Sequence, residues 1–187
     1  MKIRVVILLP AKLTAYTVQL ARRANKEVES LFFLDNKHFL PHITLCRLEV
    51  EEDSLENIKR ELTSLLADQE SIVLRTQAIE LVSDSLSTEP VGDFAIYLDL
   101  KISLPLKKLR KQVFDCVKKY NQKAEYAKLL PFRPHVTLAR FSSEAMARKA
   151  SKALKFESIE CKPAVVALTN SIQYGQVSKI IAKFRLE

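Results

Sequence analysis

The chain has 187 residues, of which 48% are hydrophobic and 28% are charged, so it can bury the core of one domain or of two small lobes. Only two glycines are present, which excludes a glycine-rich phosphate-binding loop, and three widely spaced cysteines argue against a disulfide framework and a cysteine zinc site. The formal net charge is +8, and residues 101–155 hold 15 Lys and Arg against three acidic residues. This basic stretch favours a polyanionic partner such as RNA, although a solvated, lysine-rich helix face gives the same composition.

The first half of the chain predicts three strands and two helices. Residues 3–9 are mostly β-branched residues or leucine and end at Pro10, which is typical of a buried strand. Apolar side chains recur at helical spacing in two later segments. In chain order, the predicted elements are a strand at 3–9, a helix at 12–29, a strand opening with HITL at His42, a helix at 52–67 and a strand at 72–82. The sequence STEPVGD, at residues 87–93, is the strongest turn signal.

The second half repeats this order at an offset close to 93 residues. Residues 94–102 alternate between apolar and polar side chains, which favours an antiparallel strand over a parallel, doubly wound sheet. Pro105 suits the first turn of a helix, and Ser142 or Ser143 suits the cap of a short helix. The predicted elements are a strand at 94–102, a basic helix at 105–125, a strand opening with HVTL at His135, the short capped helix, and strands at 163–169 and 179–186.

Internal symmetry on this scale predicts one bilobal α+β domain over residues 1–187, with sequence halves of about 1–90 and 91–187 that form two similar lobes. The apolar run at the N-terminus is too short for a signal peptide, and no apolar stretch approaches about 20 residues. We therefore expect a reducing, intracellular compartment and no membrane association.

Residues 39–48, FLPHITLCRL, and residues 132–141, FRPHVTLARF, share Phe, Pro, His, Thr, Leu and Arg at the same places. Side chains on a strand alternate between its two faces, so His42 and Thr44 share one face, and His135 and Thr137 share the matching face. The apolar residues between them then face the helices. If a pseudo-twofold axis relates the two halves, the His–Thr pairs face each other across a groove.

Such a groove suits attack on a phosphodiester without a metal ion. Imidazole titrates near neutrality, so one histidine can act as a general base while the other, protonated, acts as a general acid. Each threonine hydroxyl can donate a hydrogen bond to a phosphate oxygen. A lone histidine on a strand is more often structural, but two of the three histidines in this chain occupy the matched positions.

Two HxT motifs in a duplicated α+β chain resemble the 2H phosphoesterase superfamily, and FRPHVTLARF in particular resembles the RNA 2',3'-cyclic phosphodiesterases, historically named 2'-5' RNA ligases. The resemblance implies two antiparallel sheets that flank a central cleft, with helices outside. It implies that His42 and His135 are catalytic and that Thr44 and Thr137 bind phosphate. Family precedent makes His135 the base and His42 the acid, although the sequence alone does not order these roles.

The resemblance also implies the substrate and the setting. The expected reaction is hydrolysis of a 2',3'-cyclic phosphate at an RNA end, or of a related cyclic nucleotide, by a cytoplasmic, monomeric enzyme that needs neither a cofactor nor a metal. Ligation is the reverse of this reaction, with an RNA 5'-hydroxyl in place of water.

In many members of that family, a basic residue five places after the second histidine contacts phosphate. Here this residue is Arg140, and Arg47 stands in the equivalent place of the first half. Strict alternation turns Arg140 away from His135, because five is an odd number of residues, and a β-bulge would return it to the cleft. The alternative is that both arginines are ordinary residues at strand ends.

Aromatic residues near the motifs are candidates for substrate contacts. Phe39 and Phe132 suit stacking on nucleobases, although packing in the core explains them equally well. Tyr97 lies on the polar face of a predicted strand, where it either lines the cleft or meets solvent.

Two other kinds of site are not expected. His38 and His42 have a spacing that holds zinc in a helix, but Pro41 lies between them at the start of a predicted strand. Cys46 is near a histidine, but its counterpart in the second half is Ala139, so a symmetric site does not use a thiol nucleophile.

Two further functions stay open. One is an RNA-binding module that keeps the cleft, has lost turnover and uses the basic helix at 105–125 as its main surface. The other is a different reaction of the same superfamily, such as cleavage of 2'-5' oligoadenylates or trimming of an RNA 3' end.

Overall fold

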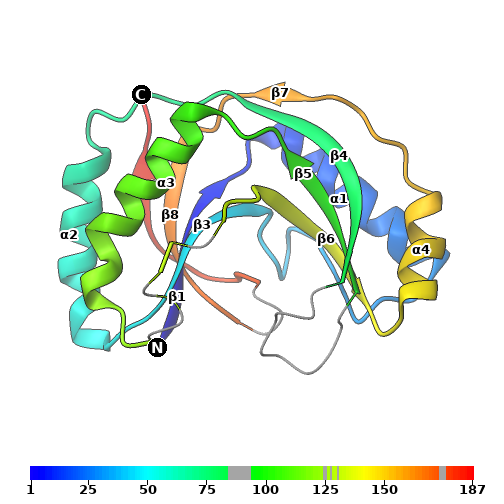
Figure 1. Ribbon diagram of the computed structural model, residues 1–187, viewed down its shortest axis with the longest axis horizontal. Helices are drawn as coiled ribbons and strands as arrows, with labels where there is room; N and C mark the ends of the chain where they lie inside the picture. The colour runs from blue at the N-terminus through cyan, green and yellow to red at the C-terminus, as the bar shows by residue number, and fades with distance from the viewer. Residues whose placement is uncertain (84–93, 124–125, 127, 130, 173–175) are drawn as a thin grey trace.

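The structure is a computed structural model that describes residues 1–83, 94–123, 126, 128–129, 131–172 and 176–187. Its strands form two antiparallel sheets (Figure 1). The first sheet has the order β3 (His42–Glu49), β1 (Lys2–Leu8), β8 (Val165–Asn170) and β9 (Ile180–Arg185). The second sheet has the order β2 (Phe32–Phe33), β6 (His135–Phe141), β5 (Phe94–Leu100), β4 (Leu74–Ser83) and β7 (Glu160–Cys161). The predicted turn at 87–93 lies outside the described residues.

Helices cover one face of each sheet. In Figure 1, α2 (Leu55–Leu66) and α3 (Leu104–Val117) lie against the first sheet, whereas α1 (Ala11–Glu27) and α4 (Glu144–Lys152) lie against the second. Their apolar faces and the facing strands form one continuous core. This arrangement confirms the predicted α+β class, with two antiparallel sheets and helices outside. None of the helices in the described part of the chain is long and apolar enough to cross a bilayer.

Both sheets combine strands of the two sequence halves. β8, from the second half, pairs with β1 in the first sheet, and β4, from the first half, pairs with β5 in the second sheet. The order β3-β1-β8 in one sheet therefore matches the order β6-β5-β4 in the other. Each lobe contains strands of both halves, so the repeat in the sequence does not divide the molecule at residue 90.

Serine side chains fix the starts of two helices. Ser103 accepts a hydrogen bond from the backbone N–H of Leu106 at the start of α3, and Ser143, rather than Ser142, accepts one from Met146 at the start of α4. Pro105 lies in the first turn of α3, as predicted.

The helix predicted at 105–125 is shorter in the structure. α3 ends at Val117, and a 3₁₀ turn, η2 (Lys118–Tyr120), follows it. The chain leaves the helix because Asn121 adopts an extended conformation and its side-chain oxygen accepts a hydrogen bond from the N–H of Glu49, at the end of β3. Contacts with a distant strand thus override the local helical pattern. A second 3₁₀ turn, η1 (Glu52–Ser54), precedes α2.

Candidate active site

β6 carries the second HxT motif and contains a β-bulge directly after it. The register of its ladder with β5 shifts by one residue at Leu138. Leu138 and Ala139 therefore both face the core, and Arg140 returns to the face that carries His135 and Thr137. The bulge explains how an arginine five residues after the histidine can share its cleft.

β3 carries the first motif and has the same bulge at the matching position. The register of its ladder with β1 shifts at Leu45. Leu45 and Cys46 both face the core, and Arg47 shares the cleft with His42 and Thr44. The repeat thus extends to an irregularity of the backbone.

A cleft lies where the strands that carry the two motifs face each other. Its described lining consists of Arg4, His42, Thr44 and Arg47 from the first sheet and Tyr97, His135, Thr137 and Arg140 from the second. Each residue of the second set lies 93 positions after its counterpart in the first set. Three of these four pairs are identical, and the fourth differs because Tyr97 corresponds to Arg4.

The two histidine rings are held in the same way. Nδ1 of His42 lies 2.7 Å from the carbonyl oxygen of Leu40, and Nδ1 of His135 lies 2.8 Å from the carbonyl oxygen of Arg133. A carbonyl oxygen only accepts hydrogen bonds, so Nδ1 of each ring carries the proton. Nε2 is left in each ring to exchange a proton with a ligand in the cleft.

The surroundings of His42 oppose its protonation. Its side chain is buried, and burial lowers the pKa of His42 from 6.5 to about 3. This value already includes the carbonyl of Leu40, which raises the pKa, and the positive charges of Arg4, His135 and Arg47, which lower it. His42 is therefore neutral in this environment at pH 7.

The surroundings of His135 are more polar. Burial also lowers the pKa of His135, but the carbonyl of Arg133 and the carboxylate of Asp99 raise it, against the charges of Arg47 and Arg133. The ring stacks on Tyr97, with 3.9 Å between the ring centroids and 14° between the planes. This stack fixes the plane of the imidazole from the neighbouring strand.

Arg4 is a cleft residue that the sequence analysis missed. It lies on β1, is 5% exposed, and its guanidinium donates hydrogen bonds to Thr44 Oγ1 (3.2 Å) and to Ser171 Oγ (2.9 Å). The signal in the sequence was a single charge within a buried strand, 93 residues before Tyr97. Because Thr44 accepts from Arg4, its own hydroxyl proton is available to a ligand.

Phe39 and Phe132, the candidates for stacking on a base, pack against the core instead of lining the described cleft. The ring of Phe39 meets Phe32 edge-on, with 4.8 Å between centroids. The guanidinium of Arg110 lies over the ring of Phe132, 4.5 Å from its centroid. Both aromatics therefore support the strands from outside the cleft.

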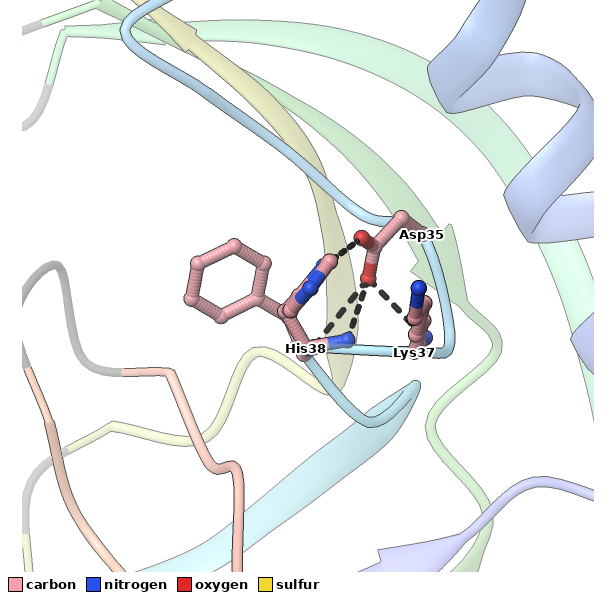
Figure 2. Close-up of polar contacts among 4 residues, drawn as sticks. Asp35, Lys37 and His38 are labelled. Carbon is pink, nitrogen blue, oxygen red and sulfur yellow. Dashed lines mark hydrogen bonds and ion pairs between the residues drawn. The ribbon is translucent and has the colours of Figure 1, made fainter.

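The segment that leads into β3 is ordered by one carboxylate. Figure 2 shows Asp35 accepting hydrogen bonds from the backbone of Lys37 and His38 and from the His38 ring. Burial opposes ionisation, but these bonds and one from the backbone of Phe39 lower the pKa of Asp35 to about 2. His38 is thus a partner of this turn and does not line the described cleft.

Cys46 is buried in the core, and burial raises the pKa of its thiol to about 12. The thiol is therefore protonated at pH 7, and the side chain packs as a small apolar residue. Within the described ranges, no three His, Cys, Asp or Glu side chains gather in a way that could hold a metal ion. His42 and His135 are the two histidines among the residues that line the described cleft.

The family model described as the 2'-5' RNA ligase superfamily matches residues 12–172 of the chain. A comparison with curated proteins finds no match. Among solved structures, a protein of Thermus thermophilus has a TM-score of 0.68 at 18% identity, with 100% of this chain and 98% of that chain covered. E. coli LigT complexed with phosphate has a TM-score of 0.64 at 16% identity, with 99% and 96% covered.

Usb1 of Kluyveromyces marxianus has a TM-score of 0.53 at 12% identity, with 99% of this chain and 97% of that chain covered. At these identities, the structural likeness concerns the fold, and it extends over almost the whole length of each chain. The family model itself spans most of the sequence, including both HxT motifs. This protein therefore belongs to the 2'-5' RNA ligase superfamily of 2H phosphoesterases, enzymes that act on phosphodiester bonds.

Proposed function

We propose that the protein is a metal-independent phosphodiesterase that hydrolyses 2',3'-cyclic phosphates at RNA ends or in related cyclic nucleotides. The observation that carries this proposal is the paired arrangement of His42 and His135 in one cleft, each with Nδ1 on a carbonyl and Nε2 left for the ligand. Two such imidazoles supply both proton transfers that the hydrolysis needs.

The reaction needs one base and one acid. A neutral imidazole removes a proton from water as the water oxygen attacks phosphorus. The bond from phosphorus to one ribose oxygen breaks, and the protonated imidazole gives its proton to that oxygen. The product is a phosphomonoester with a free neighbouring hydroxyl, and the reverse reaction with an RNA 5'-hydroxyl in place of water is ligation.

The same cleft is suited to hold the phosphate. Thr44 and Thr137 present hydroxyl groups, and Arg47 and Arg140 present guanidinium groups, at matched positions on the two strands. Guanidinium groups bind phosphate oxygens through charge-assisted hydrogen bonds and stabilise the negative charge that develops during the attack. Side chains thus replace the glycine-rich loop that the sequence lacks.

Turnover of 2',3'-cyclic nucleotides and of RNA with a cyclic phosphate end, measured in EDTA, tests the proposal. We expect activity without added metal, and we expect His42→Ala and His135→Ala each to lower kcat by about 10²–10⁴-fold. Circular dichroism of both variants controls for folding. Dependence of the activity on added metal would contradict the mechanism.

Tight RNA binding without turnover would instead favour the RNA-binding alternative, in which phosphate contacts make the affinity fall steeply with salt. Turnover of 2'-5' oligoadenylates or RNA 3' ends in place of cyclic phosphates would keep the two-histidine chemistry and change the substrate.

A further inference from the structure

The cleft is symmetric in its histidines, threonines and arginines but asymmetric in the charges on its two central strands. On β1, Arg4 places a buried guanidinium beside Thr44, on the side of His42. The matching residue on β5 is Tyr97, which is uncharged and stacks on His135. A positive charge thus stands on one side of the cleft and an aromatic ring on the other.

An ion pair is added on the second side only, and its carboxylate belongs to the residue paired with His135. Asp99 pairs with His135 across the β5–β6 ladder, and its Oδ2 accepts hydrogen bonds from Nε (2.8 Å) and a terminal nitrogen (2.7 Å) of Arg133. Its other oxygen, Oδ1, is buried, and no described residue donates to it. The carboxylate raises the pKa of His135, and the guanidinium of Arg133 lowers this pKa by less.

The first half has an apolar contact where the second half has this ion pair. The residues 93 positions before Asp99 and Arg133 are Val6 and Leu40. Val6 is fully buried, and Leu40 packs against the small apolar cluster that contains it. Among the described residues, therefore, no carboxylate raises the pKa of His42 as Asp99 raises the pKa of His135.

We infer that this asymmetry assigns the two roles in the proposed reaction: His42 is the general base and His135 is the general acid, with Arg4 and Asp99 as the positioning residues that set this order. The inference rests on the proposed function. It reverses the order that family precedent implies. The groups that face His42 are Arg4, Arg47, His135 and Arg140. Those that face His135 are Asp99, Arg133, Arg47, Arg140, Tyr97 and His42.

The electrostatic reason is that the cleft favours a single imidazolium. The charge of His135 lowers the pKa of His42, and Arg4 and burial act in the same direction. When the pair takes up one proton, that proton therefore resides on the ring beside the carboxylate. Water then gives its proton to Nε2 of His42, and the departing ribose oxygen takes the proton from Nε2 of His135.

Matched diesters with good and poor leaving groups test this order. The probes are the phenyl and p-nitrophenyl esters of one nucleoside phosphate, because p-nitrophenolate departs without protonation whereas phenolate benefits from an acid. We expect His135→Ala to lose about 100-fold or more in rate on the phenyl ester and far less on the p-nitrophenyl ester. His42→Ala should lose a similar factor on both esters.

The assignment would be overturned if His42→Ala lost much less rate on the p-nitrophenyl ester than on the phenyl ester. It would also be overturned if the two variants lost the same factor on each ester. If the wild-type protein cleaves neither ester nor any cyclic phosphate, the proposed function is refuted. This result needs only the wild-type rates and no variant. The two failures are therefore distinguishable.

The positioning residues have their own readout in the pH dependence of kcat/KM. Arg4→Gln removes a positive charge beside the base, so we expect the acidic limb of the profile to move to higher pH. Arg4→Lys keeps the positive charge, so its acidic limb should stay at the wild-type pH. Asp99→Asn removes the negative charge beside the acid, so the basic limb should move to lower pH. Limbs that stay in place in Arg4→Gln and Asp99→Asn would show that these residues are only structural.

Discussion

Arg47 and Arg140 are matched in sequence and in the cleft, but their surroundings differ. Arg140 is 7% exposed, whereas Arg47 lies at an exposed position of β3. A hydrogen bond between a guanidinium and a phosphate is stronger where water is excluded. The two arginines are therefore expected to contribute unequally to phosphate binding.

We predict that Arg140→Ala weakens the binding of inorganic phosphate by about 100-fold and Arg47→Ala by about 10-fold. These factors correspond to about 3 and 1.5 kcal/mol, the usual range for hydrogen bonds to charged groups. Isothermal titration calorimetry at low salt measures both. The control is Arg148→Ala on α4, an exposed arginine paired with Glu144, which should leave the affinity unchanged. Equal affinities for wild type and Arg140→Ala would remove this residue from the site.

Most of the candidate site could be predicted residue by residue because each half of the chain serves as a template for the other. His42, Thr44, His135 and Thr137 were predictable from the shared motif and strand parity. Arg4 was not, because its counterpart is a tyrosine and the motif comparison therefore gives no match at this position. Its role depends on a hydrogen bond to Thr44 across two strands, which only the structure shows.

At the scale of the elements, the bulge in β6 decides which residue enters the cleft. Ala139 is fully buried in the core, while Arg140 lines the cleft. Regular alternation would reverse these two positions. The bulge is fixed by pairing with β5, so it should persist when the two side chains are exchanged.

The exchange variant Ala139→Arg with Arg140→Ala tests this. We expect it to be destabilised by about 3–5 kcal/mol relative to Arg140→Ala alone, because it buries a charge without a partner. Urea unfolding measures the difference. An exchange variant that is as stable as Arg140→Ala and still binds phosphate would mean that residue 139 reaches the cleft and that the bulge is absent.

The helices could be predicted from their apolar spacing, and the strands from β-branched residues and alternation. The end of α3 could not, because a hydrogen bond from Glu49 to Asn121, 72 residues away in sequence, terminates the local pattern. β2 and β7 have two residues each, too few to give a periodic signal. Sequence patterns therefore located the helices and the longer strands, whose formation depends on their own residues, and missed the features that depend on contacts with distant segments.

At the scale of the whole molecule, the exchange of β4 and β8 joins the two halves into one folding unit. Sequence symmetry predicted two similar lobes, but it contains no information on which sheet a strand joins. Fragment 1–90 lacks β8 and β9, so one edge of β1 has no partner, and fragment 91–187 lacks β4, the partner of β5 and β7. Each fragment alone would expose an unpaired strand edge and part of the core.

We therefore predict that neither fragment folds alone and that the full chain unfolds in a single transition. Circular dichroism and urea unfolding of the separate and co-expressed fragments measure this. Co-expression should restore structure and phosphate binding. A fragment with a cooperative transition of its own would contradict the prediction and make the halves independent domains.

Burial of the two histidines also links the stability of the whole chain to pH. The pKa of His42 is about 3 in the folded protein and 6.5 in an unfolded chain, and the pKa of His135 is lowered in the same direction. Below pH 6.5, the unfolded state therefore binds more protons than the folded state, so the free energy of unfolding falls as the pH falls. Asp35, with a pKa of about 2, has the same sign but acts only below about pH 4.

We predict that His42 alone makes the protein about 2 kcal/mol less stable at pH 5 than at pH 7.5. Urea unfolding at the two values measures this, and His42→Asn should remove that part of the loss because asparagine does not titrate. The matched control is His38→Asn, which replaces a largely exposed histidine and should keep the full dependence. If wild type and His42→Asn lose the same free energy of unfolding, His42 is not the group that couples folding to pH. A neutral His42 in the folded state is what the assignment of this residue as the base requires, so the stability experiment tests that assignment without any substrate.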